Sequence, residues 1–316
     1  MLKRTGGLAG AVLLATMGLV GCGGPEETDL LWGRSPSWSR DGRLIAFDQH
    51  TRSPESSVDF TYYSALTSGF IWVIQADGTN PRQLTFRGQD QSPSWSPDNV
   101  HLAFVSEEGG QTDIWTMDAV GGQRMPLTND RAVDLEPAWS PDGSRIAYAS
   151  LRQGNWDIWI MNADGSGATP LTTAAADDTS PAWSPDGRSI VFASNRDRGN
   201  WDLWAVDVDG TNLRQITSKP GKSRRIDGKP AWSPDGTQIA YASWDGNWDV
   251  WLVNQDGSGA RALTNDPEHD GDPTWSPRQP DGTFKIAFAS ARTGWWHVYV
   301  MDRDGSNVRQ ITGTKG

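Results

Sequence analysis

One short pattern, Pro-x-Trp-Ser, recurs six times along this chain of 316 residues, and the repetition restricts the possible folds more than any other feature. Consecutive copies lie 43 to 57 residues apart, and each is followed by a second aromatic residue and a closing Leu-Thr or Ile-Thr pair. The repeat tryptophans are Trp38, Trp95, Trp139, Trp183, Trp232 and Trp275. A period of this length is typical of propellers and solenoids, in which each repeat buries its apolar faces against its neighbours.

The third copy indicates how one unit folds. Residues 137–140, 145–150, 158–161 and 169–172 are short segments of apolar or β-forming residues, and Pro-Asp-Gly, Gly-Asn and Asp-Gly turn signals separate them. Four antiparallel strands make one blade, and six blades can close radially so that only short edges stay exposed. The sequence therefore predicts an all-β fold, a six-bladed β-propeller of four-stranded antiparallel blades over residues 30–316.

These units resemble the PD40 (WD40-like), or TolB-type, propeller repeat. The resemblance rests on the Pro-x-Trp-Ser-Pro-Asp-Gly turn, an Ile-Ala-Phe-like strand, an Ile-Trp or Ile-Tyr strand and the terminal Leu-Thr, and it covers residues 35–312. The first copy departs from it at Arg40, and the last around Arg278-Gln279. TolB carries an additional N-terminal domain where this chain has a short tether. The resemblance implies a non-catalytic scaffold that docks on another protein of the cell envelope.

The start of the chain has the features of a lipoprotein signal peptide. A positively charged segment precedes an apolar run over residues 8–20, which is too short for a permanent membrane span and ends just before Cys22, the single cysteine. We expect residues 1–21 to be removed, Cys22 to be lipidated and residues 22–29 to form a tether. The protein would then be secreted and lipid-anchored, at the periplasmic face of the outer membrane in a cell with two membranes and otherwise at the outer face of the plasma membrane.

The charge of the chain argues against nucleic acid as a partner. The formal net charge is −11, and removal of Lys3 and Arg4 with the leader takes it to −13. With no cysteine besides Cys22, the fold must be stabilised by a buried apolar core rather than by disulfides. We expect a monomeric propeller.

A carboxylate stands five positions before the repeat tryptophan in every copy except the first, which has glycine there. These residues are Asp90, Asp134, Asp178, Asp227 and Asp270. They should form a ring on one face of the propeller, called the top here, where the second strand of a blade connects to the third. One interpretation is a Ca²⁺ site. The interpretation that we favour is structural, without a metal or other cofactor.

In the structural interpretation the aspartates accept hydrogen bonds in their loops and pair with arginines of adjacent blades. The candidate arginines are Arg152, Arg196 and Arg292. The first, second and fifth copies have Gln49, Glu108 and Asp245 near that place, which predicts a more acidic top face over blades 1, 2 and 5.

Departures from the repeat are candidates for partner contact, because they distinguish this chain from a generic propeller. The first unit has an insertion with three aromatic residues, a basic segment over residues 219–225 separates the fourth and fifth units, and two tryptophans fall outside the repeat positions. We expect these residues on the top face: Phe60, Tyr62, Tyr63, Arg224, Arg225, Trp244 and Trp295.

Enzymatic activity is not expected, because the single cysteine is assigned to the anchor and no activated nucleophile is evident. One cluster keeps an alternative open. His50, His269 and His297 belong to blades that become neighbours on closure, and with Asp270 and Asp272 they could form a metal site. The alternative function is a polysaccharide-binding or polysaccharide-cleaving propeller that uses this site and Trp244 and Trp295.

Overall fold

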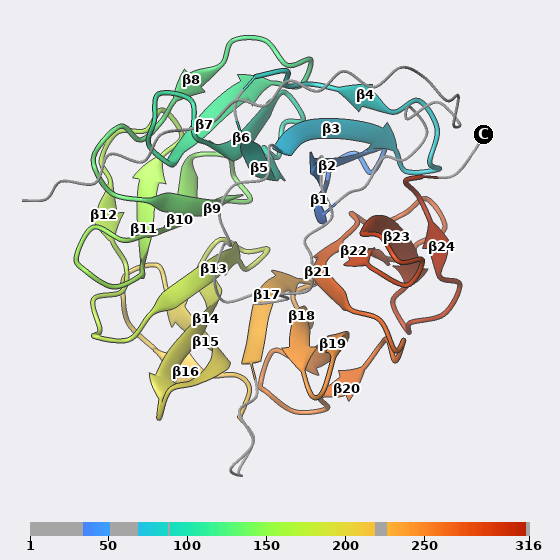
Figure 1. Cartoon of the computed structure of the whole chain (residues 1–316). Helices are drawn as coiled ribbons and strands as arrows, with labels where there is room; N and C mark the ends of the chain where they lie inside the picture. The colour runs from blue at the N-terminus through green and yellow to red at the C-terminus, as the bar shows by residue number, and fades with distance from the viewer. Residues whose placement is uncertain (1–33, 51–68, 88, 219–225, 314–316) are drawn as a thin grey trace, which may run out of the picture.

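The computed structural model describes residues 34–87, 89–218 and 226–313 with the exception of 51–68, and these residues form the predicted six-bladed propeller (Figure 1). The blades follow one another in chain order around a central channel. The predicted signal peptide, Cys22 and the tether lie outside the described residues.

Each blade has four antiparallel strands, in chain order from the channel outward. The innermost strands are β1 (Arg34–Trp38), β5 (Asp90–Trp95), β9 (Asp134–Trp139), β13 (Asp178–Trp183), β17 (Ile226–Trp232) and β21 (Asp270–Trp275). The second strands are β2 (Leu44–His50), β6 (His101–Ser106), β10 (Arg145–Ser150), β14 (Ser189–Asp197), β18 (Gln238–Trp244) and β22 (Lys285–Ser290). The third strands are β3 (Gly69–Gln75), β7 (Asp113–Asp118), β11 (Asp157–Asn162), β15 (Asn200–Asp207), β19 (Trp248–Asn254) and β23 (His297–Asp302). The two-residue outer strands are β4 (Arg82–Gln83), β8 (Met125–Pro126), β12 (Thr169–Pro170), β16 (Arg214–Gln215), β20 (Arg261–Ala262) and β24 (Arg309–Gln310).

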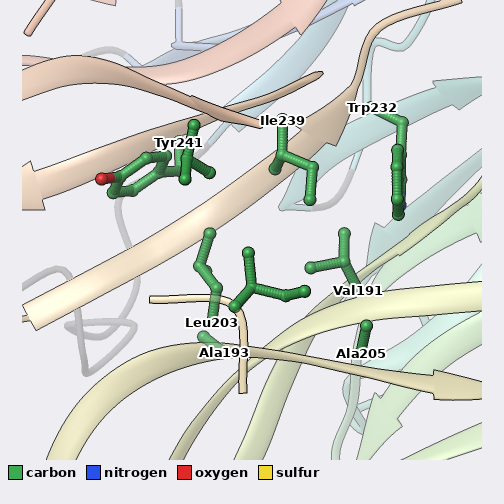
Figure 2. Packing of buried hydrophobic residues seen from close by; sticks show 9 residues of the cluster. Val191, Ala193, Leu203, Ala205, Trp232, Ile239 and Tyr241 are labelled. Atoms are coloured by element: carbon green, nitrogen blue, oxygen red, sulfur yellow. The ribbon is translucent and has the colours of Figure 1, made fainter. Parts of the chain in front are cut away.

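The apolar core lies between consecutive blades rather than inside any one of them. Figure 2 shows this at the junction of blades 4 and 5, where Val191 and Leu203 face Ile239 and Tyr241. The seam between the first and last blades is built in the same way, with Trp38 and Phe47 packed against Val298. Within the described residues every blade consists of its own four consecutive strands, and these residues close the ring without an exchanged strand.

The threonine that ends each unit fastens the outer edge of its blade. Its hydroxyl accepts a hydrogen bond of 2.9 to 3.0 Å from a backbone N–H near the start of the third strand, and this contact occurs in every blade. The six threonines are Thr85, Thr128, Thr172, Thr217, Thr264 and Thr312, and all are buried. The closing Leu-Thr or Ile-Thr pair therefore has a structural role, because it satisfies a buried N–H that the two-residue outer strand leaves unpaired.

Each innermost strand contains a bulge. The register slips at this point in every blade, and the residue before the repeat proline takes a left-handed backbone conformation with φ between 47° and 57°. These residues are Ser35, Ser92, Glu136, Ser180, Lys229 and Asp272. The following proline has no N–H to donate, which explains why the ladder is interrupted there.

The outer Asp-Gly turns hold neighbouring blades together by close backbone approach. A methyl group at Gly165 would lie 2.6 Å from the carbonyl oxygen of Leu127 in the preceding blade. Equivalent contacts occur at Gly121, Gly257 and Gly305, and at the seam between Gly78 and Ile311. Gly210 is the exception, since a methyl group there would meet nothing within 4 Å.

The described part of the chain has no helix that is long and apolar enough to cross a membrane.

The glycine contacts predict unequal effects of one substitution in two blades. Gly165 and Gly210 have φ values of 86° and 83°, so alanine is strained at both, by about 1 kcal/mol. Gly165→Ala also forces the blades apart, and we expect it to lower the free energy of unfolding by about a further 1–3 kcal/mol. Urea denaturation of the two variants measures the difference, and equal losses would contradict an inter-blade role for this glycine.

Candidate functional site

The aspartate ring is at the top of the propeller and is buried, and four of its five carboxylates pair with an arginine. Asp90, Asp134, Asp178, Asp227 and Asp270 have almost no exposed surface. In blade 3, Arg152 Nη2 lies 2.9 Å from Asp134 Oδ2, and in blade 4, Arg196 Nη2 lies 2.7 Å from Asp178 Oδ2. Arg292 Nη2 lies 3.0 Å from Asp270 Oδ2 in blade 6.

These pairs join residues of one blade, so the expectation that the arginines reach adjacent blades is wrong. The reason is strand register. Ser150 on β10 is directly opposite Asp134 on β9, and Arg152 follows Ser150 by two residues, which brings its guanidinium back over its own hairpin. There it also lies 4.7 Å above the centre of the Trp159 ring, which holds the long side chain in place.

In blade 2 the arginine that binds the ring aspartate comes from a different position in the sequence of the blade. Arg124, just before β8, extends over the Phe104 ring and binds Asp90 at 3.0 Å and Glu108 at 2.8 Å. Arg124 thus shares its single positive charge between two carboxylates, so the prediction of a more acidic top face over this blade stays a prediction. The sequence position of Arg124, in an outer turn, gave no indication of this pairing.

Burial affects the ionisation of two carboxylates of the ring. Burial raises the pKa of Asp134 and of Asp270, against the opposing effect of Arg152 and Arg292. Carboxylates that already accept hydrogen bonds from a guanidinium offer few oxygens to a cation. Among the described residues, no group of three or more His, Cys, Asp or Glu side chains is arranged to hold a metal ion.

The members of the proposed histidine cluster that the structure describes do not form a ligand set. His297 is buried at the start of β23, with Nδ1 3.3 Å from Thr312 Oγ1. His269 Nδ1 accepts a hydrogen bond of 3.2 Å from the Trp248 backbone N–H. The side chain of His50 is outside the described residues.

The structure describes two of the predicted contact residues, Trp295 and Trp244. Trp295 is 38% exposed in the loop between β22 and β23 on the top face. Trp244 is half-buried, and its ring centre lies 5.6 Å from that of His269 and 5.7 Å from that of Trp248. The remaining predicted contacts lie outside the described residues: Phe60, Tyr62, Tyr63, Arg224 and Arg225.

The prediction of contact residues from the sequence missed two exposed apolar residues of the top face. Phe86, in the loop between β4 and β5, is 71% exposed, and Leu151, directly after β10, is 37% exposed. A signal for Phe86 was present in the sequence. It follows the closing Leu-Thr of its unit, where the other five units have Asn129, Thr173, Ser218, Asn265 and Gly313.

Charged side chains of the channel wall hold the strand bulges. Glu136 accepts hydrogen bonds from the Ser180 backbone N–H, at 2.6 Å, and the Ser180 hydroxyl, at 3.0 Å, and it forms an ion pair with Lys229. Burial disfavours the charged form of Glu136, but Lys229 and the Ser180 hydrogen bonds hold its pKa below the usual value.

Two other carboxylates bind bulges of the next blade in the same manner. Asp272 Oδ2 accepts from the Ser35 N–H at 3.3 Å, and Asp48 Oδ2 accepts from the Ser92 N–H at 3.1 Å. These buried carboxylates therefore connect neighbouring blades, a role that sequence spacing did not indicate.

Comparison with known proteins places this geometry in a family. A family model described as PD40, TolB beta propeller domain, matches residues 70–226 and 218–316. The chain belongs to the TolB-type propeller family. Among curated relatives, the Tol-Pal system protein TolB of Alkalilimnicola ehrlichii is 39% identical over 64 residues, which are 20% of this chain and 15% of that protein. A TolB homolog of Chlorobium luteolum is 43% identical over 54 residues, 17% of this chain and 12% of the homolog. The chain thus matches a small part of the length of each relative.

Solved structures extend the similarity to the whole TolB-type ring. A TolB structure from Agrobacterium tumefaciens superposes with a TM-score of 0.65 at 25% identity, over 82% of this chain and 90% of that chain. An oligogalacturonate lyase from Vibrio parahaemolyticus has a TM-score of 0.54 at 13% identity, over 87% of this chain and 91% of the lyase. At that identity the lyase shares the fold alone.

The arginine pairs predict a large effect of one substitution in this TolB-type propeller. Arg196→Met would leave the buried Asp178 without its guanidinium, and we expect a loss of about 3 kcal/mol in the free energy of unfolding at pH 7. Arg198→Met is the matched control, because the Arg198 side chain is 92% exposed and its ion pair to Asp197 is 4.0 Å long. Chemical denaturation compares the two variants. Similar small losses would mean that Asp178 does not depend on its arginine.

Proposed function

We propose that this chain is a non-catalytic, lipid-anchored propeller of the cell envelope that binds a partner protein through its top face. The observation that carries the proposal is the exposure there of Phe86, Leu151 and Trp295. All three are on the face where the aspartate ring is buried and four of its five carboxylates bind an arginine. A partner would therefore meet apolar side chains on a rigid base rather than an open ring of charge.

The placement of these side chains suits protein recognition. Phe86 and Trp295 belong to blades 1 and 6, which are neighbours across the seam, and Leu151 belongs to blade 3. Large apolar side chains surrounded by polar surface are the usual anchors of protein interfaces. Short loops on a closed ring lose little conformational freedom on binding, which favours affinity.

Two further observations support the envelope role. The curated relatives matched by part of the chain are named Tol-Pal system protein TolB, and membership of the TolB-type family is consistent with a contact between envelope proteins. In the proposal, the lipidated Cys22 supplies the membrane anchor, and the acidic chain has no affinity for nucleic acid.

The alternative, a polysaccharide-binding or polysaccharide-cleaving propeller, has weaker support. Trp244, its main candidate, is half-buried and packs against His269 and Trp248, which is typical of a residue that stabilises its own loop.

Site-specific photo-cross-linking of the full-length chain in its native envelope tests the proposal. A photoreactive phenylalanine analogue replaces Phe86 or Trp295 on the top face. The controls, Val120 and Val308, are on the opposite face and are matched in exposure, with 69% against 71% for Phe86 and 40% against 38% for Trp295. We expect both top-face probes to capture the same protein and neither control to do so.

Equal capture from both faces, or no captured protein from the top-face probes, would contradict the proposal. In the second case, binding of glycans to the purified chain becomes the next measurement.

A further inference from the structure

The bottom end of the channel opens into a cavity of about 250 Å³. All six blades contribute to it, through the repeat tryptophan and residues beside it. Five blades also contribute the proline that follows Trp-Ser, namely Pro97, Pro141, Pro185, Pro234 and Pro277. The walls are thus rigid, ring-shaped side chains, and the cavity is on the face opposite the proposed partner site.

Blade 1 breaks the symmetry of this cavity. Where the other blades have proline, it has Arg40, which lines the cavity and is exposed. No hydrogen bond or ion pair involves the Arg40 guanidinium within the described part of the chain. A single cation is therefore placed at the rim of an aromatic cavity.

The other polar groups of the rim are already engaged. Ser39 Oγ donates to Asp41 Oδ1 at 2.7 Å, and the same Ser–Asp contact occurs in blades 2 to 5. Cations balance two of these carboxylates, since Arg303 Nη1 lies 2.8 Å from Asp235 and Arg43 Nε lies 3.7 Å from Asp41. Among the described residues that line the cavity, Arg40 is the one charged side chain, and it remains available to a ligand.

We propose that this cavity binds a small carboxylate with a flat apolar body. The ring of the ligand would lie among the indole and pyrrolidine walls, and its carboxylate would pair with Arg40. A planar guanidinium matches a carboxylate with two parallel hydrogen bonds. The volume is below the ~300–1,000 Å³ of pockets for drug-sized molecules, which restricts the ligand to about one ring.

The proposal does not rest on the proposed function, because the two sites are at opposite ends of the channel. Arg40→Pro is the decisive variant, since it restores the sequence that the other blades already have at this turn. Proline should be tolerated here because the Arg40 N–H donates no hydrogen bond to the described residues. The turn also has the same conformation in blade 1 as in blade 3, since the turn glycine has a φ of 73° at both Gly42 and Gly143. The variant should therefore fold, and its thermal melting curve verifies this.

The probe is phenylacetate, with phenylacetamide as its uncharged counterpart, and isothermal titration calorimetry on the full chain measures both. We expect phenylacetate to bind about tenfold more tightly than phenylacetamide. Arg40→Pro should weaken phenylacetate binding by about tenfold and remove the preference for the charged probe. The control Arg188→Gln, an exposed arginine in the corresponding turn of blade 4 that does not line the cavity, should leave binding unchanged.

Three results would overturn the inference: no binding of phenylacetate at millimolar concentration, equal affinity for the two probes, or unchanged phenylacetate affinity in Arg40→Pro. Partner capture at Phe86 and Trp295 should be the same in Arg40→Pro and the wild-type chain, so failure of one proposal is distinguishable from failure of the other.

Discussion

The packing of each blade against the next is the interaction on which the rest of the structure depends. A single four-stranded blade has two apolar faces and no partner for either, so its second strand becomes buried only when both neighbours are in place. The glycine contacts show how close this packing is, because the backbone of one blade leaves no room for a methyl group on the next. The seam between Gly78 and Ile311 is of the same kind, and the ring therefore closes by ordinary packing.

The repeated residues already have structural roles in the propeller. The closing threonines hold the outer edges, four of the five aspartates of the ring bind an arginine of their own blade, and the serines of the bottom turns in blades 1 to 5 bind nearby aspartates. What is left for recognition is the set of residues that depart from the repeat. On the top face these are Phe86, Leu151 and Trp295, and at the bottom of the channel it is Arg40.

The fold could be predicted from the sequence because a sixfold period with four strand signals in each unit leaves few other architectures. The site was only partly predictable. Burial of the aspartates followed from their position in the repeat, but their partners depend on strand register and on the reach of a long side chain. Arg124 shows this most clearly, because it comes from an outer turn to occupy the place of a missing top-face arginine. The Glu136–Lys229 pair joins bulge residues of blades 3 and 5, which are not consecutive in the ring, and the local sequence around either residue does not indicate it.

We infer that the six blades form one closed and cooperative ring, which leaves only the departures from the repeat free for binding. Hydrogen exchange of backbone amides in the six second strands distinguishes such a ring from an open array. Because a closed ring has no end blade, we expect a single opening free energy for β2, β6, β10, β14, β18 and β22. Protection that falls progressively toward blades 1 and 6 would contradict it, because the chain would then behave as an open array with two exposed ends.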